Sequence, residues 1–210
     1  MNQQHEYIGT RKLLIGIVLA VITFWLFANS LINVIPNLQT SFGSYLSTIS
    51  IAVSLTALFC GMFVVGAGSL ADYFGRVRLT IIGLWLNIFG SLLIIVSDYI
   101  PLLLMGRAIQ GLSAALIMPA TLSLIKAYYH GDKRQRALSL WSIGSWGGSG
   151  FASLFGGMIA TFLSWRWIFV FSIIVSLIAV LLIKGTPESK NQHASSRQFD
   201  IVGLILLVVM

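Results

Sequence analysis

The sequence of 210 residues has few charged side chains. Only 9% of its residues are Asp, Glu, Lys or Arg, whereas 57% are hydrophobic. Soluble domains carry roughly 25% charged and about 45–50% apolar residues, and the mean hydropathy here is +0.92. This composition excludes an ordinary soluble domain and predicts an all-α polytopic membrane protein.

Residues that commonly form catalytic or metal sites are also scarce. The one cysteine, Cys60, lies in an apolar run, so no disulfide can form within the chain. The three histidines, His5, His130 and His193, occur in separate polar segments without metal-ligand spacing. The sequence contains no GxxxxGKS/T loop for an ATP-driven pump. We therefore expect no enzyme, no metal site and no ATP-driven pump.

Long uncharged runs predict six transmembrane helices. Each run is close to or above the ~17–25 residues that a helix needs to cross about 30 Å of hydrocarbon. The runs cover residues 13–35, 46–71, 79–97, 99–125, 137–165 and 167–183, and only Arg107 interrupts one of them. A cleaved signal peptide is the alternative for the first run, but that run exceeds the ~7–15 apolar residues of a signal sequence, and five more runs follow.

The runs divide the chain into four parts. Residues 1–12 form a polar N-terminus, residues 13–183 a six-helix bundle and residues 184–200 a polar linker, and residues 201–210 begin a seventh apolar run. At about 1.5 Å per residue, ten residues span only half of a bilayer. We therefore expect the sequence to be the front part of a longer transporter-like protein. Alternatively, the last run lies along the interface, although it lacks the polar face of such helices.

The distribution of lysine and arginine predicts the orientation. If the N-terminus is cytoplasmic, only Arg166 lies in an outer loop, and Arg107 lies within a span. The inner segments hold the other cations: Arg11, Lys12, Arg76, Arg78, Lys126, Lys133, Arg134, Arg136, Lys184, Lys190 and Arg197. The positive-inside rule then places residues 1–12 and 184–200 in the cytoplasm. It also explains most of the net charge of +7, so we expect the lipid bilayer, and no nucleic acid, as a partner.

Residues 68–78, GSLADYFGRVR, concentrate charge between the second and third runs. Gly68 and Gly75 allow close backbone approach or a positive φ. Asp72 can accept hydrogen bonds from a neighbouring helix N-terminus, and Arg76 and Arg78 can pair with acids or headgroups. A basic loop that only sets the topology is the simpler interpretation, but it does not require an acid at a fixed distance before Gly-Arg.

The fourth run carries an arginine. A charge within a span costs several kcal/mol unless it faces protein or water, so Arg107 is a functional hypothesis. Helical spacing places small and polar residues on its face: Arg107, Gln110, Gly111, Ala114, Ala115 and Met118. Snorkelling is the alternative, since Arg107 is about eight residues, or roughly 12 Å, from the outer end of its run.

The fifth run carries a seam of small residues. Gly144, Gly148, Ala152 and Gly156 recur every four residues, with Gly157 beside the last of them. Such a seam lets another helix approach closely, and we expect it to let packed helices slide or bend as well.

These three stretches resemble signatures of the major facilitator superfamily. Residues 68–78 are similar to its loop signature between helices two and three, with Tyr73 where the family usually has a basic residue. The resemblance implies that Asp72 and Arg76 help to latch two six-helix halves together on the cytoplasmic side, with Gly68 and Gly75 as steric supports.

The other two stretches narrow the resemblance. Arg107 and Gln110 match the fourth-helix signature that is implicated in proton coupling in the antiporters of the superfamily. The seam resembles the fifth-helix signature of its exporters, although Ala152-Ser153 replaces the usual Gly-Pro. Over its whole length the chain looks most like the fourteen-helix drug/proton antiporter branch and the Nor-type quinolone and multidrug efflux proteins of Gram-positive bacteria. It would form the first half of such a protein.

The resemblance implies proton-coupled efflux of amphipathic small-molecule drugs across the cell membrane. The proton motive force would drive it without a cofactor, and a C-terminal helical half beyond these residues would be the partner. A solute importer of the same fold and a transport-inactive fragment are the alternatives. The seam in the fifth run argues against the importer.

Antiport needs a carboxylate that binds and releases protons, and burial is the usual way to raise its pKa. The six acids of the sequence all lie outside the deep part of the runs, and Asp98, at the outer mouth, is the nearest candidate. We expect the main proton carrier in the C-terminal half, with Arg107 tuning the pathway. Polar and large apolar side chains within the runs are candidates for the substrate cavity: Asn29, Asn33, Met62, Met118, Trp141 and Phe155. For the asparagines, hydrogen bonding between helices is an equally good account.

Overall fold

The computed structural model describes residues 7–189, and this part of the chain is helical apart from short turns. Four helices are continuous: α3 (Leu46–Phe74), α4 (Arg76–Ile95), α5 (Ile100–Tyr128) and α8 (Arg166–Ile183). Two further rods consist of several helical segments each. The first rod contains α1 (Arg11–Ile22), the π-helical η1 (Thr23–Ala28), the 3-10 helix η2 (Leu31–Val34) and α2 (Ile35–Phe42). The second of these, called the fifth rod from its place in chain order, contains α6 (Gly131–Ser142), the π-helical η3 (Ile143–Gly147) and α7 (Gly148–Phe162).

Glycine sets two of the breaks between rods. Gly43 ends α2 in the left-handed conformation, with φ 57°, which favours glycine because a side chain is strained there. Gly75 alone separates α3 from α4 and has φ 118°. The sequence suggested a longer loop at residues 72–78, but both helices continue through it up to this one residue.

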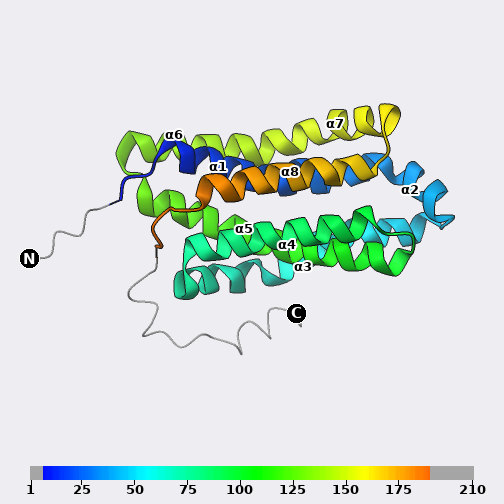
Figure 1. The fold of residues 1–210 in the computed structure, drawn as a ribbon, viewed down its shortest axis with the longest axis horizontal. Coiled ribbons are helices and arrows are strands. Elements are labelled where there is room, and N and C mark those ends of the chain that lie inside the picture. The colour runs from blue at the N-terminus through cyan, green and yellow to red at the C-terminus, as the bar shows by residue number, and fades with distance from the viewer. Residues whose placement is uncertain (1–6, 190–210) are drawn as a thin grey trace, which may run out of the picture.

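The rods lie side by side along a common direction (Figure 1). The longest contacts join α5 to α3 and to α4, α8 packs on α1 and α4, and the fifth rod packs on the first. The bundle is therefore built from helices that are distant in sequence, and α5 lies in its middle.

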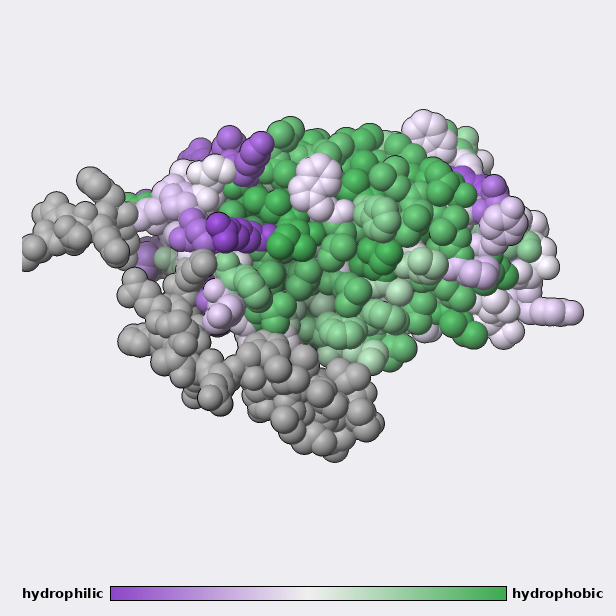
Figure 2. Space-filling model, turned by 60° about the horizontal axis from the view of Figure 1, so that its bottom comes forward, coloured by the Kyte–Doolittle hydropathy of each residue, from purple (hydrophilic) through white to green (hydrophobic). Residues whose placement is uncertain are grey.

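The surface fits a lipid environment. Five rods are long and apolar enough to cross a membrane, namely Arg11–Phe42, α3, α4, α5 and α8. The remaining rod, α6–η3–α7, is not among these five. It is long enough for a span, but its glycines and serines lower its mean hydropathy. On the face drawn in Figure 2, hydrophobic side chains cover the middle of the molecule and hydrophilic ones lie toward its two ends. The chain is thus an all-α polytopic membrane protein, as the sequence predicted.

The interior consists of two apolar clusters with polar residues between them. One cluster, around Ile17, Leu84 and Leu124, lies toward the end where α1 begins. The other, around Leu31 and Phe169, lies toward the opposite end. The buried polar residues between them include Thr56, Asn87, Ser91, Arg107, Gln110 and Ser113. Of the predicted linker, residues 184–189 are described; the remainder of it and the predicted seventh helix, residues 201–210, lie outside the described residues.

Candidate functional site

Arg107 lies at the centre of the bundle and is only 1% exposed. Its Nε donates to the Ala52 carbonyl at 3.1 Å, and its Nη2 donates to the carbonyls of Val53 and Ala28, both at 3.4 Å. Its Nη1 donates to Gln110 Oε1 at 2.9 Å. The guanidinium therefore joins α5 to α3 and to the first rod, and it does not extend to the end of the bundle as a snorkelling side chain would.

The local backbone supplies these acceptors. Ala28 is the last residue of the π-helical segment η1, where the regular hydrogen-bonding pattern of the first rod changes. Ala52 and Val53 lie in the regular helix α3, and each carbonyl has a second lone pair to offer. Gly111 brings α3 and α5 close together, since a Cβ there would lie 2.6 Å from the Thr56 carbonyl oxygen.

The hydrogen bonds leave the charge of Arg107 unbalanced. A guanidinium has five N–H donors, and four hydrogen bonds satisfy most of them here. All acceptors are neutral, and within residues 7–189 no carboxylate forms a salt bridge with Arg107. A buried charge without a partner is costly, and these four hydrogen bonds are what compensates it among the described residues.

Gln110 extends this network to α4. Its Nε2 donates to Ser91 Oγ at 3.0 Å, while the hydroxyl of Thr56 donates to the carbonyl of Arg107 at 3.0 Å. The face predicted from helical spacing is largely buried: Arg107, Gln110, Gly111, Ala114 and Ala115 are buried, and Met118 is partly exposed. One connected polar network thus links α3, α4, α5 and the first rod.

Asp98, predicted to take part in proton coupling, does not join this network. Its side chain is 79% exposed and lies 3.4 Å from Arg166. Arg166 also donates to the carbonyls of Ile95 and Ser97, both at 2.9 Å. Asp98 and Arg166 therefore connect the turn between α4 and α5 to the start of α8, away from Arg107.

At the other end of the bundle, Asp72 accepts two hydrogen bonds from Arg76, one from Nε at 3.1 Å and one from Nη2 at 2.8 Å. This pair spans the break at Gly75. Gly68 lies against Pro119 of α5, and a Cβ there would make an ordinary contact of 3.7 Å. The structure therefore places these four loop-signature residues at one end of α3 and α4, with Arg76 as the most connected of them.

Sequence reasoning missed Glu188. Its Oε1 accepts from the backbone N–H of Val77 at 2.8 Å, and its Oε2 accepts from that of Arg78 at 3.0 Å. Glu188 thus caps the N-terminus of α4, where a negative charge is stabilising. Arg76 reaches the same segment, donating to Ser189 Oγ at 3.2 Å. The sequence signal was an acid shortly after the sixth run, but only the tertiary fold identifies the helix that it caps.

The seam of the fifth rod packs on the first rod. A Cβ at Gly144 would lie 3.2 Å from Val18, and one at Gly156 would lie 2.9 Å from the Ser30 carbonyl oxygen. Ser30 Oγ also donates to the Ala152 carbonyl at 3.1 Å. Gly157 has open space around its Cα instead, with nothing within 4 Å of a Cβ, so it is not part of this contact.

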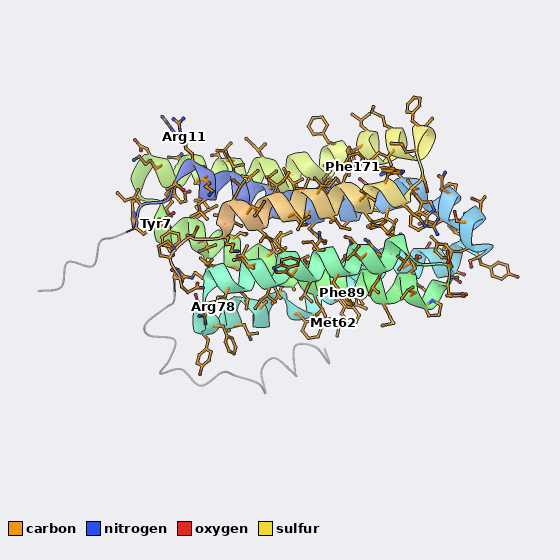
Figure 3. The ribbon with its side chains drawn as sticks, viewed as in Figure 1. Tyr7, Arg11, Met62, Arg78, Phe89 and Phe171 are labelled. Atoms are coloured by element: carbon orange, nitrogen blue, oxygen red, sulfur yellow. The ribbon has the colours of Figure 1, made fainter. Side chains whose placement is uncertain are left out.

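The candidates for a substrate cavity are dispersed. Phe155 forms edge contacts with Phe27 and Phe171 in the cluster far from the start of α1. Trp141 lies against the opposite cluster and donates to Thr121 Oγ1 at 3.1 Å. Asn33 is exposed, whereas Asn29, Met62 and Met118 are partly exposed. Figure 3 shows Met62 on the outer side of α3. The structure does not bring these residues together in one site.

Comparisons with known proteins agree with this architecture. The sequence profile described as the Major Facilitator Superfamily matches residues 13–208. The quinolone resistance protein NorB of Staphylococcus aureus, in strains JH9 and Newman, is 68% identical over 202 residues. That match covers 96% of this chain and 44% of the relative, so the chain spans less than half of the length of the curated relatives it matches.

Solved structures share the fold at low identity. The peptide transporter POT in complex with sulfate superposes with a TM-score of 0.71 at 16% identity, covering 94% of this chain and 44% of that one. A D-xylose–proton symporter superposes with a TM-score of 0.68 at 16% identity, covering 85% of this chain and 48% of that one. In both structures the match corresponds to slightly less than half of the transporter.

Proposed function

The chain belongs to the Major Facilitator Superfamily, a family of transporters and not of enzymes. We propose that it forms the first helical half of a proton-driven exporter of amphipathic drugs. Quinolones are the first substrate class to test, because the NorB relatives are named for quinolone resistance. The buried, unpaired charge of Arg107 is the observation that carries the proposal.

Arg107 is suited to act on a carboxylate that comes from outside these residues. Its neutral partners leave a full positive charge inside the bundle. A positive charge within about 4–6 Å of a carboxylate favours the ionised form and lowers its pKa. Because Arg107 is only 1% exposed within this half, the first rod and α3 would have to move apart before a proton-carrying carboxylate of the second half comes this close. The carboxylate would then release its proton near Arg107 and regain it on moving away.

Two further contacts support a rocking motion of this half. The Asp72–Arg76 pair and the Glu188 cap tie α3, α4 and the segment after α8 into one unit. The Gly144–Gly156 seam joins two rods that both contain π-helical segments, η1 and η3, and such segments frequently mark functional sites. We propose that this contact lets the first and fifth rods adjust to each other while the rest moves as a body.

Orientation is part of the same proposal. The segments predicted to be inside carry nearly all cations of residues 7–189. These cations are Arg11, Lys12, Arg76, Arg78, Lys126, Lys133, Arg134, Arg136 and Lys184. The positive-inside rule then makes the end that carries residues 1–12 and 184–200 cytoplasmic, and the cell membrane is the proposed location.

Efflux from cells tests the function. The full gene product that contains these residues would be expressed in a drug-sensitive bacterial host loaded with norfloxacin or ethidium. We expect faster loss of the compound than from cells with an empty vector, and a protonophore should abolish the difference. Accumulation faster than in the empty-vector cells would indicate an importer, and no difference for either compound would contradict drug export.

A further inference from the structure

A groove lies between α1 and α6 at the end where both helices begin. It has a volume of about 640 Å³ and is lined by residues of these two helices and of the segments just before them. The lining residues are Gly9, Arg11, Leu14, Ile15, Val18, Leu19, Tyr129, Lys133, Arg136 and Leu140. Of the residues discussed above for transport, only Val18, which packs against Gly144 of the seam, also lines this groove.

The groove is divided into a cationic mouth and an apolar floor. Arg11, Lys133 and Arg136 are all exposed and supply three positive charges at one end. Figure 3 shows Arg11 projecting outward from the start of α1. From Arg11 to Leu19 the lining continues along α1 for about 12 Å at 1.5 Å per residue, and its remaining α1 residues are apolar.

The groove opens to the outside of the bundle. Ile15 is 54% exposed and Leu140 is 43% exposed. The adjacent face of α6 is directed to the interior, because Ala137 is fully buried and Trp141 donates to Thr121 of α5. An apolar groove on the lipid-facing side of a membrane protein is accessible to acyl chains.

The electrostatics favour an anion at the mouth. Both α1 and α6 begin at this end, so the positive ends of their helix dipoles add to the three cations. Asp132, in the first turn of α6, lines a neighbouring hollow that shares Tyr129 and Lys133 with the groove, but it does not line the groove itself. The Tyr129 hydroxyl donates to the Thr10 carbonyl at 2.7 Å, and burial raises the pKa of Tyr129 to about 12, so this side chain adds no negative charge.

We propose that this groove binds one anionic glycerophospholipid of the surrounding leaflet, with the headgroup phosphate at Arg11, Lys133 and Arg136 and an acyl chain along Leu14, Val18 and Leu140. The combination of fixed cations and a long apolar floor matches both parts of such a molecule. Basic pockets between transmembrane helices near the membrane surface bind anionic headgroups in this way. The inference requires only a membrane location and is independent of the proposed transport function.

Lipid titration of the purified full gene product in detergent, followed by native mass spectrometry, tests the proposal. Phosphatidylglycerol should bind roughly a hundredfold more tightly than phosphatidylcholine, since each of the three cations near the headgroup contributes about fivefold. Inorganic phosphate at millimolar concentration should not displace it, because free phosphate cannot use the apolar floor. Equal binding of the two lipids, or full displacement by phosphate, would overturn the proposal.

Charge variants locate the site. The triple variant Arg11→Gln, Lys133→Gln, Arg136→Gln should lose the preference for phosphatidylglycerol. The matched control Lys126→Gln, Arg134→Gln, Lys184→Gln removes the same net charge from the same end of the bundle, outside the groove, and should keep the preference. Equal losses in both variants would mean general charge attraction and would overturn the assigned site.

Single variants keep the test usable if the triple variant does not fold. Arg136→Gln should weaken phosphatidylglycerol binding about fivefold, whereas Arg134→Gln, two residues earlier on the same helix, should leave it within twofold. Leu140→Asn should weaken the binding of long-chain phosphatidylglycerol more than that of a short-chain analogue. Identical effects of Arg136→Gln and Arg134→Gln would contradict the proposal.

Discussion

Gly75 leaves the space that Glu188 occupies. A Cβ at Gly75 would overlap with the carboxylate of Glu188, and the same carboxylate accepts hydrogen bonds from the first turn of α4. The glycine therefore has two roles. It adopts a φ of 118° that other residues rarely adopt, and it leaves room for Glu188, which follows α8, to cap the next helix.

Gly75→Ala should destabilise the protein by about 1–3 kcal/mol from backbone strain alone, with a further loss from the displaced cap. The measurement is the apparent melting temperature of the purified protein. Gly43→Ala is the matched control, because Gly43 also has a positive φ but has nothing within 4 Å of a Cβ. A decrease no larger than that of Gly43→Ala would show that the contact with Glu188 adds nothing.

Glu188→Gln should weaken the cap of α4 by about 0.5–2 kcal/mol, because it removes the charge that faces the helix N-terminus. Hydrogen exchange at the amides of Val77 and Arg78 should accelerate, while exchange in the middle of α4 should not change. Asp98→Asn, at an exposed acid on the opposite end, is the control and should leave these amides unaffected. Unchanged exchange at Val77 and Arg78 in Glu188→Gln would contradict the cap.

Gly156→Ala should disturb the contact between the fifth and first rods, because its Cβ would lie 2.9 Å from the Ser30 carbonyl oxygen. We expect a loss of about 1–3 kcal/mol from overpacking. Gly157→Ala, in the adjacent open position, should be neutral or slightly stabilising, since alanine favours a helix over glycine. Comparison of the two melting temperatures decides the point, and equal values would exclude a close contact at Gly156.

Asn87→Leu should loosen the packing of α4 against α8. The buried Asn87 amide donates to Ser172 Oγ at 2.9 Å and to Ser176 Oγ at 2.8 Å. Hydrogen bonds between transmembrane helices contribute about 0.6–2 kcal/mol each, so a loss of this order in unfolding free energy is expected. Thermal unfolding of Asn87→Leu, compared with Asn87→Ser and the wild type, measures this loss. Equal stability of Asn87→Leu and the wild type would show that the two hydrogen bonds contribute nothing.

The sequence predicted the parts of the fold that depend on local pattern. Apolar runs identified the helical rods, and the spacing around Arg107 identified a face that is largely buried. The lengths of the breaks were overestimated, because charged residues at helix ends, such as Asp72 and Arg76, are compatible with helix as well as loop. Hydropathy alone also does not distinguish the π-helical segments η1 and η3, which lie where the first and fifth rods contact each other.

Partners distant in sequence could not be predicted in the same way. Glu188 and Val77 are 111 residues apart, and no local pattern connects them. Asp98 was chosen as the acid nearest to the fourth span, but its closest cation is Arg166, on the helix that packs beside it. The acceptors of Arg107 are mostly backbone carbonyls, which every residue carries, so the sequence contains no signal for them.

The role of Arg107 is the central claim, and proton-coupled transport by its variants tests it most directly. The full gene product and its Arg107→Lys and Arg107→Ala variants would be reconstituted in liposomes, and norfloxacin-dependent proton flux would be measured under an imposed pH gradient. Lysine keeps the charge but cannot reproduce four hydrogen bonds to acceptors on three helical rods. We predict loss of coupled flux in Arg107→Ala and a decrease of at least about tenfold in Arg107→Lys, with norfloxacin binding retained. Wild-type coupled flux in Arg107→Ala would contradict the account.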